Sequence, residues 1–254
     1  MPHRTPPSMP AGTADTADTA VVAEPVIRPR PWVRMKVAAS LDGRTALRNG
    51  ESRWITSPQA RADGHAWRAR ADAVLTGIGT VLADDPRLDV RLAPVTRQPD
   101  LAVVDSRLRT PLDAQLFQPD RKVHLYAAGC TDPALADGLA ARGARIVVAP
   151  GALGRVDLAA VLQDLSEQGV KVLHVEAGAE LNGALLRAGL VDELLLYMAP
   201  SLLGEGRSMA DLGVLASLSQ ATTLAFDSVE RVGPDLRIVA RLQPAEAPLS
   251  RLPR

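Results

Sequence analysis

The sequence predicts a single α/β domain built on a mostly parallel sheet, and three observations lead to this prediction. Strand-like runs alternate with helix-like segments from residue 31 to about residue 200. The final stretch, residues 222–243, instead reads as two strands around a "GPD" turn, which predicts an antiparallel hairpin at one edge of the sheet. The chain has 254 residues, of which 46% are hydrophobic and 23% charged, so it is long and apolar enough to bury a large core.

The first strand is expected from Val33 to Ala39, because apolar and polar residues alternate there, and the following Asp42-Gly43 pair signals a turn. Period-two or continuous apolar runs bounded by turn residues predict six more strands, at 72–77, 101–106, 122–128, 144–149, 170–176 and 191–200.

Three helices are expected between these strands, at 55–71, 156–169 and 179–189. Thr56 and Gln59 have the spacing of a capping box at the start of the first helix, and Pro58 suits its first turn. The second helix has apolar residues at helical spacing and closes at Gly169.

Composition limits the class of protein. Residues 1–30 and 244–254 lack an apolar period and are predicted to be disordered tails, which leaves residues 31–243 as the domain. The 29 basic and 29 acidic residues balance, and no apolar run approaches the ~18 residues of a membrane span, so no nucleic-acid or membrane partner is expected. Without a secretory signal, we expect a cytoplasmic protein. The single cysteine, Cys130, and the spacing of the four histidines argue against an internal disulfide or a metal site.

Two strand-to-helix junctions are the candidates for ligand binding, because ligands in open α/β sheets gather at the carboxyl ends of strands. One is Gly77-Ile78-Gly79-Thr80, which suits a phosphate at a helix start near Thr80, although a Gly-x-Gly-Thr sequence taken alone is more often a plain turn. The other runs from Glu176 through Gly178 to a helix from about Glu180, where a carboxylate beside free N–H groups suits a hydroxyl-rich ligand such as a ribose.

Three basic residues lie near these junctions, and each is either a phosphate contact or a solvated surface charge. Arg68 lies on the first helix, Arg91 follows the first glycine junction, and Lys36 interrupts an apolar strand, which makes Lys36 the least suited to a surface role. His174 alternates with apolar neighbours in a strand and is expected to be a satisfied core or edge histidine.

Longer strings of the sequence are similar to a known family. "KVAASLDGRTA", "GESRWITSPQAR", "RARADAVLTGIGTVLADDPRLDVR", "VVDSRLRTP", "HVEAGAELNGALLRAGLVDELLLYMAPSLLG" and "VGPDLRI" resemble, in order, the reductase domain of the bifunctional riboflavin-biosynthesis deaminase/reductase over residues 31–242. The resemblance implies a dihydrofolate-reductase-like fold with helices on both faces of the sheet. It also implies NADPH-dependent reduction of 5-amino-6-(5-phosphoribosylamino)uracil to the ribitylamino compound, with hydride delivered to C1′ of the ribose, and a homodimer.

The same resemblance implies roles for individual residues. Lys36 and Glu176 would be catalytic, with Lys36 binding a hydroxyl or supplying the proton that accompanies hydride addition. The substrate would be held by Lys36, Ser52, Arg68, Leu88, Arg91 and Glu176. NADPH would be held by Ala38, Trp54, Thr80, Asp84, Ser106, Gly178, Ala179, Glu180, Leu181, Asn182, Gly183 and Ala184.

One departure from the family bears on the substrate. The sequence lacks the combined H-x-E and P-C-x-x-C signature of the zinc deaminase, because its single cysteine cannot supply P-C-x-x-C, so we expect no deamination by this chain and a separate deaminase partner. Alternatives are a reductase of a related phosphoribosyl-pyrimidine or pteridine, a non-catalytic NADPH-binding paralogue, and a structural subunit that docks on a deaminase.

Overall fold

The structure of the chain is a computed structural model, and it describes residues 30–129 and 132–243. The tails predicted at the two termini lie outside these residues, except for Arg30, as does Cys130. In the part of the chain described, no helix is long and apolar enough to cross a membrane.

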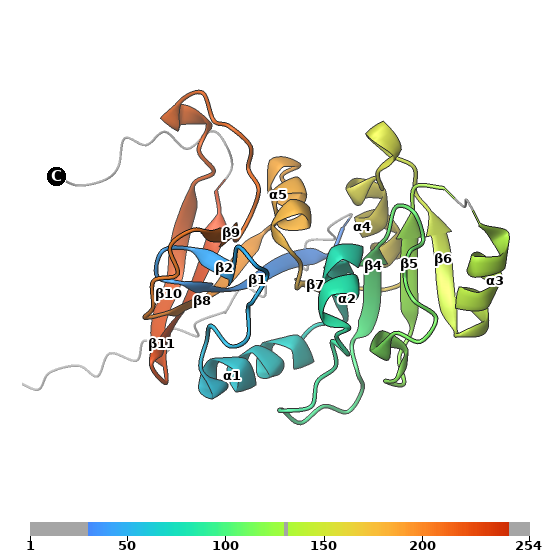
Figure 1. Cartoon of the computed structure of the whole chain (residues 1–254), viewed down its shortest axis with the longest axis horizontal. Helices are drawn as coiled ribbons and strands as arrows, with labels where there is room; N and C mark the ends of the chain where they lie inside the picture. Colours follow the sequence, from blue (N-terminus) through green and yellow to red (C-terminus); the bar gives the residue numbers. More distant parts are fainter. Residues whose placement is uncertain (1–29, 130–131, 244–254) are drawn as a thin grey trace, which may run out of the picture.

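A nine-stranded sheet runs through the whole domain in the order β10-β11-β8-β1-β7-β3-β4-β5-β6 (Figure 1). The strands from β8 to β6 in that order are parallel, and β11 and β10 add an antiparallel edge. A separate small antiparallel pair is formed by β2 and β9. The strand bounds are β1 Trp32–Ser40, β2 Arg44–Leu47, β3 Ala73–Gly77, β4 Asp100–Val104, β5 Val123–Ala127, β6 Ala144–Val148, β7 Val172–Val175, β8 Glu193–Ala199, β9 Gly206–Ser208, β10 Leu224–Val232 and β11 Asp235–Leu242.

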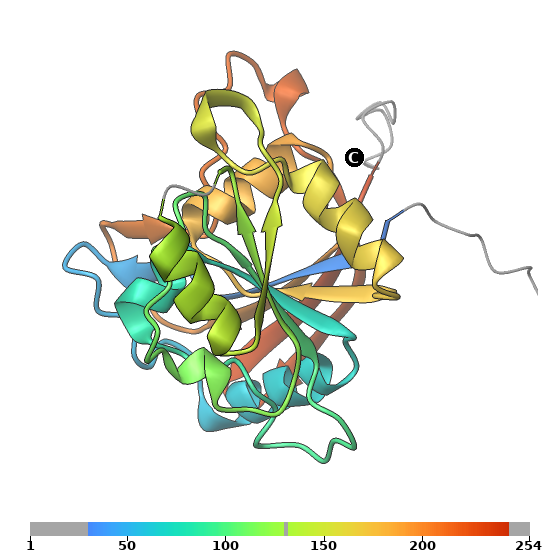
Figure 2. The same ribbon diagram turned by 90° about the vertical axis from the view of Figure 1, so that its right-hand side faces the viewer.

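Helices cover both faces of the sheet, as predicted (Figure 2). On one face lie α4 and α5, and on the other lie α1, α2 and α3. The helix bounds are α1 Pro58–Ala69, α2 Ile78–Asp84, α3 Pro133–Ala141, α4 Leu158–Glu167 and α5 Ala179–Arg187, with short 3-10 turns η1 Gln115–Phe117, η2 Ala152–Gly154 and η3 Leu218–Gln220.

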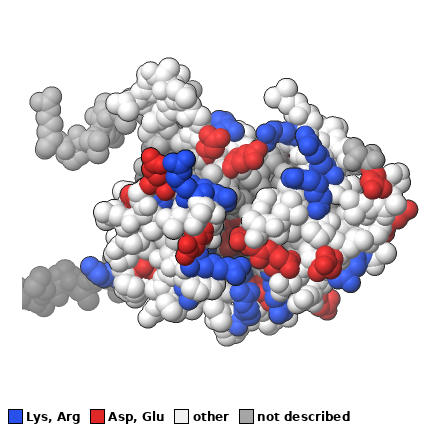
Figure 3. Space-filling model, viewed as in Figure 1, with Lys and Arg blue, Asp and Glu red and all other residues white. Residues whose placement is uncertain are grey.

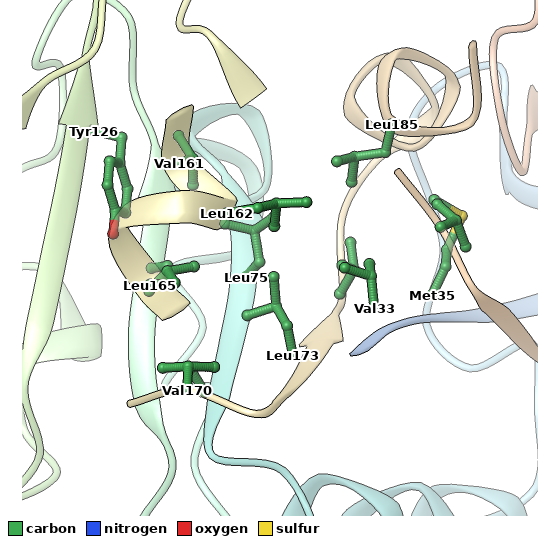
Figure 4. Packing of buried hydrophobic residues seen from close by; sticks show 14 of the residues in the cluster. Val33, Met35, Leu75, Tyr126, Val161, Leu162, Leu165, Val170, Leu173 and Leu185 are labelled. Carbon is green, nitrogen blue, oxygen red and sulfur yellow. The ribbon is translucent and has the colours of Figure 1, made fainter. Parts of the chain in front are cut away.

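The largest core cluster lies between the sheet and the α4/α5 layer (Figure 4). Leu162 and Leu165 of α4 pack on buried strand residues such as Leu75 and Leu173, and all four side chains are at most 1% exposed. At ~25 cal/mol per Å² of buried apolar area, each such leucine contributes about 2 kcal/mol. This packing fixes the strand ends from which the site is built.

The strand predictions are confirmed within two residues at each end, and the two-residue hairpin turn at Gly233-Pro234 is found where it was expected. Gly169 closes α4 with a φ of 86°, as predicted. The predicted cap of α1 is wrong by one residue: Ser57, not Thr56, accepts from the N–H of Ala60, and Pro58 is the first helical residue. Helix α3 and the short strands β2 and β9 were not predicted.

Candidate active site

The two predicted ligand junctions meet near the middle of the sheet. β3 and β7 are adjacent parallel strands. From β3 the chain continues through α2 toward β4 on one side, and from β7 through α5 to β8 on the other. Such a divergence opens a crevice at the carboxyl ends of the strands. A Cβ placed on Gly77 would lie 3.3 Å from Cδ2 of Leu181, so the end of β3 contacts α5 directly.

The two helices at this crevice begin differently from the other three. In α1, α3 and α4 the capping side chain of Ser57, Asp132 or Asp157 accepts hydrogen bonds from backbone N–H groups of the first turn. Within the described residues, α2 and α5 begin after Gly77 and Gly178 without any side-chain cap. The free N–H groups and the positive end of the helix dipole suit an anionic ligand.

Space is open beside these helix starts. Among the residues that the structure describes, and apart from the adjoining residues and the backbone of the same helix, no heavy atom lies within 4 Å of a Cβ built on Gly79 or Gly178. Helix α5 begins at Ala179, the first residue of the helix predicted at 179–189, and α2 begins at Ile78, two residues before the helix start predicted near Thr80.

The next turn of α5 is fixed against the 209–211 segment. The side-chain amide of Asn182 donates to the carbonyls of Ala177 (3.1 Å) and Met209 (2.9 Å). A Cβ on Gly183 would overlap the carbonyl of Asp211, so only glycine fits there. The Asp211 N–H also donates to the carbonyl of Ala179 (2.8 Å).

Glu180 points elsewhere, because its carboxylate pairs with exposed Arg155, and Ala184 lies further along the helix, where its carbonyl accepts from the N–H of Ala188 at 3.1 Å.

Glu176 lies at the carboxyl end of β7 in the centre of a cluster of charged side chains. Arg68 on α1 donates to both of its carboxylate oxygens, Nε to Oε1 at 2.6 Å and Nη2 to Oε2 at 2.9 Å. Lys36 on β1 places Nζ 3.9 Å from Oε2. The side chains of Glu176 and Arg68 are only 13% and 10% exposed, so the pair is largely shielded from solvent. The structure therefore brings together three of the residues predicted from the sequence.

The charges in this cluster are interdependent. Burial would raise the pKa of Glu176, but the positive charges of Arg68 and Lys36 outweigh burial and hold that pKa below its usual range. Burial lowers the pKa of Lys36, against the opposing effect of Glu176. The geometry thus keeps a carboxylate ionised in a shielded site and gives it a lysine that releases its proton more readily than an exposed one.

His174 lies beneath this cluster and is fully buried, as predicted. It is not satisfied, however. Its Nε2 is 3.5 Å from Oε1 of Glu176, and neither ring nitrogen has a hydrogen-bond partner within the described ranges. Burial lowers its pKa to about 3, so the ring is neutral.

The loop after α2 presents Arg91 beside the cluster. Arg91 Nη1 donates to Oδ1 of Asp89 at 2.5 Å, and its side chain is 54% exposed, so part of the guanidinium faces solvent. Arg68 also donates to the backbone carbonyl of Asp89, which links this loop to Glu176. Leu88 is 7% exposed with a φ of 51°, so its side chain is a buried anchor of the loop.

The remaining predicted residues lie around this centre. Trp54 is 68% exposed, with the guanidinium of Arg61 4.2 Å from its ring centre. Arg53 Nη2 donates to the carbonyl of Asp84 at 3.4 Å, which brings the 51–56 segment, including Ser52, next to α2. Thr80 lies in the first turn of α2, Ala38 lies on β1 opposite Tyr197 of β8, and Ser106 follows β4. Among residues 30–129 and 132–243, no hydrogen bond or ion pair joins Ser106, Ala38 or Thr80 to the Glu176 cluster.

The face that carries these residues is hollowed near its centre, with acidic and basic side chains along the rim (Figure 3). Sequence reasoning missed two members of the charged network. Asp89 is 3% exposed and pairs with both Arg87 and Arg91, and His65 on α1 accepts from the Arg91 N–H at 3.4 Å. In the sequence, Asp89 is marked only by its position between Arg87 and Arg91, two residues from each.

Comparisons with known proteins agree with this geometry. Residues 31–238 match the model of the RibD C-terminal domain family. The chain is 40% identical over 220 residues to riboflavin biosynthesis protein RibD of Escherichia coli K12, covering 81% of this chain and 58% of that protein. It is 37% identical over 215 residues to RibD of Mycobacterium tuberculosis H37Rv, covering 83% of this chain and 55% of that protein.

Solved structures give the same picture. Form 1 of Acinetobacter baumannii RibD has a TM-score of 0.74 at 36% identity, covering 85% of this chain and 59% of that one. The riboflavin biosynthesis reductase Rib7 of Saccharomyces shares the fold with a TM-score of 0.63 at 20% identity, covering 85% of this chain and 91% of that one. The chain thus spans less than two thirds of the RibD proteins that it matches. It belongs to the RibD C-terminal domain family, the reductase domain with the dihydrofolate-reductase-like fold that the family resemblance implied.

Proposed function

We propose that this chain catalyses the NADPH-dependent reduction of 5-amino-6-(5-phosphoribosylamino)uracil to 5-amino-6-(5-phosphoribitylamino)uracil. The observation that carries the proposal is the shielded cluster of Lys36, Glu176 and Arg68 beside a helix that begins without a side-chain cap. A protein that only binds a dinucleotide has no need of this cluster, whereas a reductase must orient a sugar next to its cofactor.

The cofactor fits the residues present. The free N–H groups of α5 and the open space at Gly178 would receive the phosphates, and exposed Trp54 offers a ring for stacking. Thr80, Asp84 and Ser106 would contribute polar contacts. When bound, NADPH supplies the hydride for C1′ of the substrate.

The chain's own residues orient the sugar and handle the proton. As the C1′–O4′ bond opens, O4′ gains a proton, and we assign this proton to Nζ of Lys36, whose pKa burial lowers. The ionised Glu176 accepts hydrogen bonds from ribose hydroxyls and holds Lys36 in place. A proton from solvent restores Lys36 after each turnover.

The family resemblance assigns both Arg68 and Arg91 to substrate binding, but their contacts support different roles. Three of the five N–H groups of Arg68 are used by Glu176 and the Asp89 carbonyl, so Arg68 mainly orients Glu176. Arg91 is half-exposed and keeps free N–H groups, so we assign the substrate phosphate chiefly to Arg91, with Ser52 and the backbone at Leu88 beside it.

The direct test is to mix the purified chain with NADPH and enzymatically generated substrate, to follow NADPH absorbance and to weigh the product. Stoichiometric NADPH loss with a product two hydrogens heavier supports the proposal. If the chain turns over only another phosphoribosyl-pyrimidine or a pteridine, that compound takes the place of the proposed substrate. If it binds NADPH but turns over none of these compounds, it is a non-catalytic protein.

We also propose that the chain forms a homodimer through the open edge of the sheet. β10 is an edge strand, and its Phe226 and Val229 are 74% and 53% exposed. The neighbouring 211–222 segment exposes Val214 and Leu218 as well. Light scattering after size exclusion should give twice the mass of the chain for the wild type and a monomer for Phe226→Asp. A monomeric wild type would refute the dimer. The cytoplasmic location and a separate deaminase partner stay predictions, to be tested by cell fractionation and co-purification.

A further inference from the structure

The loop from Asp85 to Arg91 has no regular secondary structure, yet side chains distant in the sequence hold almost every residue of it. Gln115 binds the carboxylate of Asp85 through its backbone and side-chain N–H groups, at 2.9 and 3.1 Å. Gln98 makes two hydrogen bonds to the backbone of Val90, at 2.7 and 2.9 Å. The loop is therefore shaped by its surroundings and not by local propensity.

Two consecutive residues in the middle of this loop, Arg87 and Leu88, are held by the side chain of Arg121, while Arg68 holds the carbonyl of the next residue, Asp89. The guanidinium of Arg121 donates to the carbonyl of Leu88 at 2.6 Å, to the carbonyl of Arg87, and to the carbonyl of Leu116 at 3.2 Å. Three backbone carbonyls are thus bound by one planar fork of donors, an arrangement that lysine cannot reproduce. Burial lowers the pKa of Arg121 to about 10, so it stays charged at neutral pH.

The hydrogen bonds from Arg121 also affect Asp89 and the two arginines that pair with it. Two of the three carbonyls that Arg121 binds belong to Arg87 and Leu88, the residues directly before Asp89, and Asp89 holds Arg87 at 3.1 Å and Arg91 at 2.5 Å. Leu88 between them takes a φ of 51°, which a non-glycine residue adopts only when its surroundings hold it there. The backbone conformation at Arg87 and Leu88 therefore decides where the two exposed guanidinium groups point.

We propose that Arg121 is a positioning residue which, by fixing the carbonyls of Arg87 and Leu88, aims Arg87 and Arg91 at the phosphate of the substrate and so sets the preference of the site for a phosphorylated ligand. This inference rests on the proposed function, since it assigns the phosphate to this loop. Arg121 itself does not touch the substrate.

The test compares Arg121→Met with Arg142→Met, a control whose guanidinium lies 5.4 Å from the ring of Phe117. In Arg121→Met the KM for the phosphorylated substrate should rise about tenfold, as the loss of a charge-assisted hydrogen-bond network implies. The KM for the dephosphorylated riboside and the Kd for NADPH should stay within about twofold, because the Glu176 cluster and α5 are unchanged. Arg121→Lys, which keeps the charge but loses the fork, should fall between the wild type and Arg121→Met.

Hydrogen exchange gives a readout that does not depend on turnover. The amides of residues 88–91 should exchange faster in Arg121→Met than in Arg142→Met, while those of α5 stay protected. An equal rise in KM for both substrates, or unchanged exchange in the loop, would overturn the positioning role. If the wild type reduces neither compound, the proposed function fails. The inference is then decided by exchange and by calorimetric binding of ribose 5-phosphate, which Arg121→Met should weaken and whose unchanged binding would refute it.

Discussion

Replacing Glu176 with glutamine should destabilise the protein strongly, because it leaves the guanidinium of Arg68 without a negative partner. The two side chains are 13% and 10% exposed and share two hydrogen bonds of 2.6 and 2.9 Å. Removing one partner of a buried ion pair costs about 3–5 kcal/mol, since the remaining charge stays desolvated. Glutamine keeps one acceptor oxygen for Arg68, which places the expected loss near the lower end, at about 3 kcal/mol.

For a chain of this size a loss of that order lowers Tm by roughly 6–12 °C. Urea denaturation at pH 7 measures the free energy of unfolding, and calorimetry measures Tm. The double variant Arg68→Met/Glu176→Gln should recover at least about 1.5 kcal/mol of the summed single losses, because neither charge is then buried alone. Activity should be absent in Glu176→Gln, in the single variant Arg68→Met and in the double variant. A loss below about 1 kcal/mol in Glu176→Gln, or strictly additive losses in the double variant, would refute the buried-pair reasoning.

Three other predictions concern the helix starts, the cofactor and pH. Gly183→Ala should cost about 3 kcal/mol or more because the new methyl group overlaps a backbone carbonyl, whereas Gly79→Ala, whose methyl group meets no described atom within 4 Å, should gain up to about 1 kcal/mol of helix propensity. Trp54→Ala should change the unfolding free energy by less than about 0.5 kcal/mol, since the ring is 68% exposed, but should weaken NADPH binding by about tenfold in a fluorescence titration. Burial lowers the pKa of His65 to about 4 and that of His174 to about 3 in the folded chain. Below pH 6.5 these two histidines are therefore protonated in the unfolded chain but still neutral in the folded chain. Stability should therefore be complete above pH 6.5 and fall by about 1.4 kcal/mol per pH unit for each histidine as pH decreases toward 4.

Each of these predictions has a clear contrary result. Equal stability of Gly183→Ala and Gly79→Ala would mean that α5 is not held against the 209–211 segment. Unchanged NADPH affinity in Trp54→Ala would remove the ring from the cofactor site. His65→Gln should reduce the slope of stability against pH between 6 and 4 by about 1.4 kcal/mol per unit, and an unchanged slope would mean that His65 is not held neutral.

The sequence predicted those parts of the fold that depend on local patterns. The alternation of strands and helices and the Gly233-Pro234 hairpin turn could be read directly, because periodicity and turn chemistry act over a few residues. The cap of α1 was misplaced by one position, since Thr56 and Ser57 are both good caps and only the backbone dihedrals decide between them. The β2–β9 pair was missed because it joins two very short segments about 160 residues apart.

Some residues of the candidate site could likewise be predicted from the sequence, and others could not. Lys36 and Glu176 could be found because they are charged residues in or at the end of apolar strands, where burying a charge without a partner is energetically costly. Asp89 and Arg121 could not, because each looks like an ordinary loop charge. Asp89 is buried and Arg121 half-buried because of contacts with segments that lie far away in the sequence. The residue-level roles came from the family resemblance, and they remain predictions.

The most direct test of the account is the reductase assay with the purified chain, NADPH and 5-amino-6-(5-phosphoribosylamino)uracil, run beside Lys36→Met. We predict one NADPH consumed for each product molecule, a product two hydrogens heavier than the substrate, and loss of turnover but retained NADPH binding in Lys36→Met. Absence of product with a folded, NADPH-binding wild type, or full activity in Lys36→Met, would contradict the account.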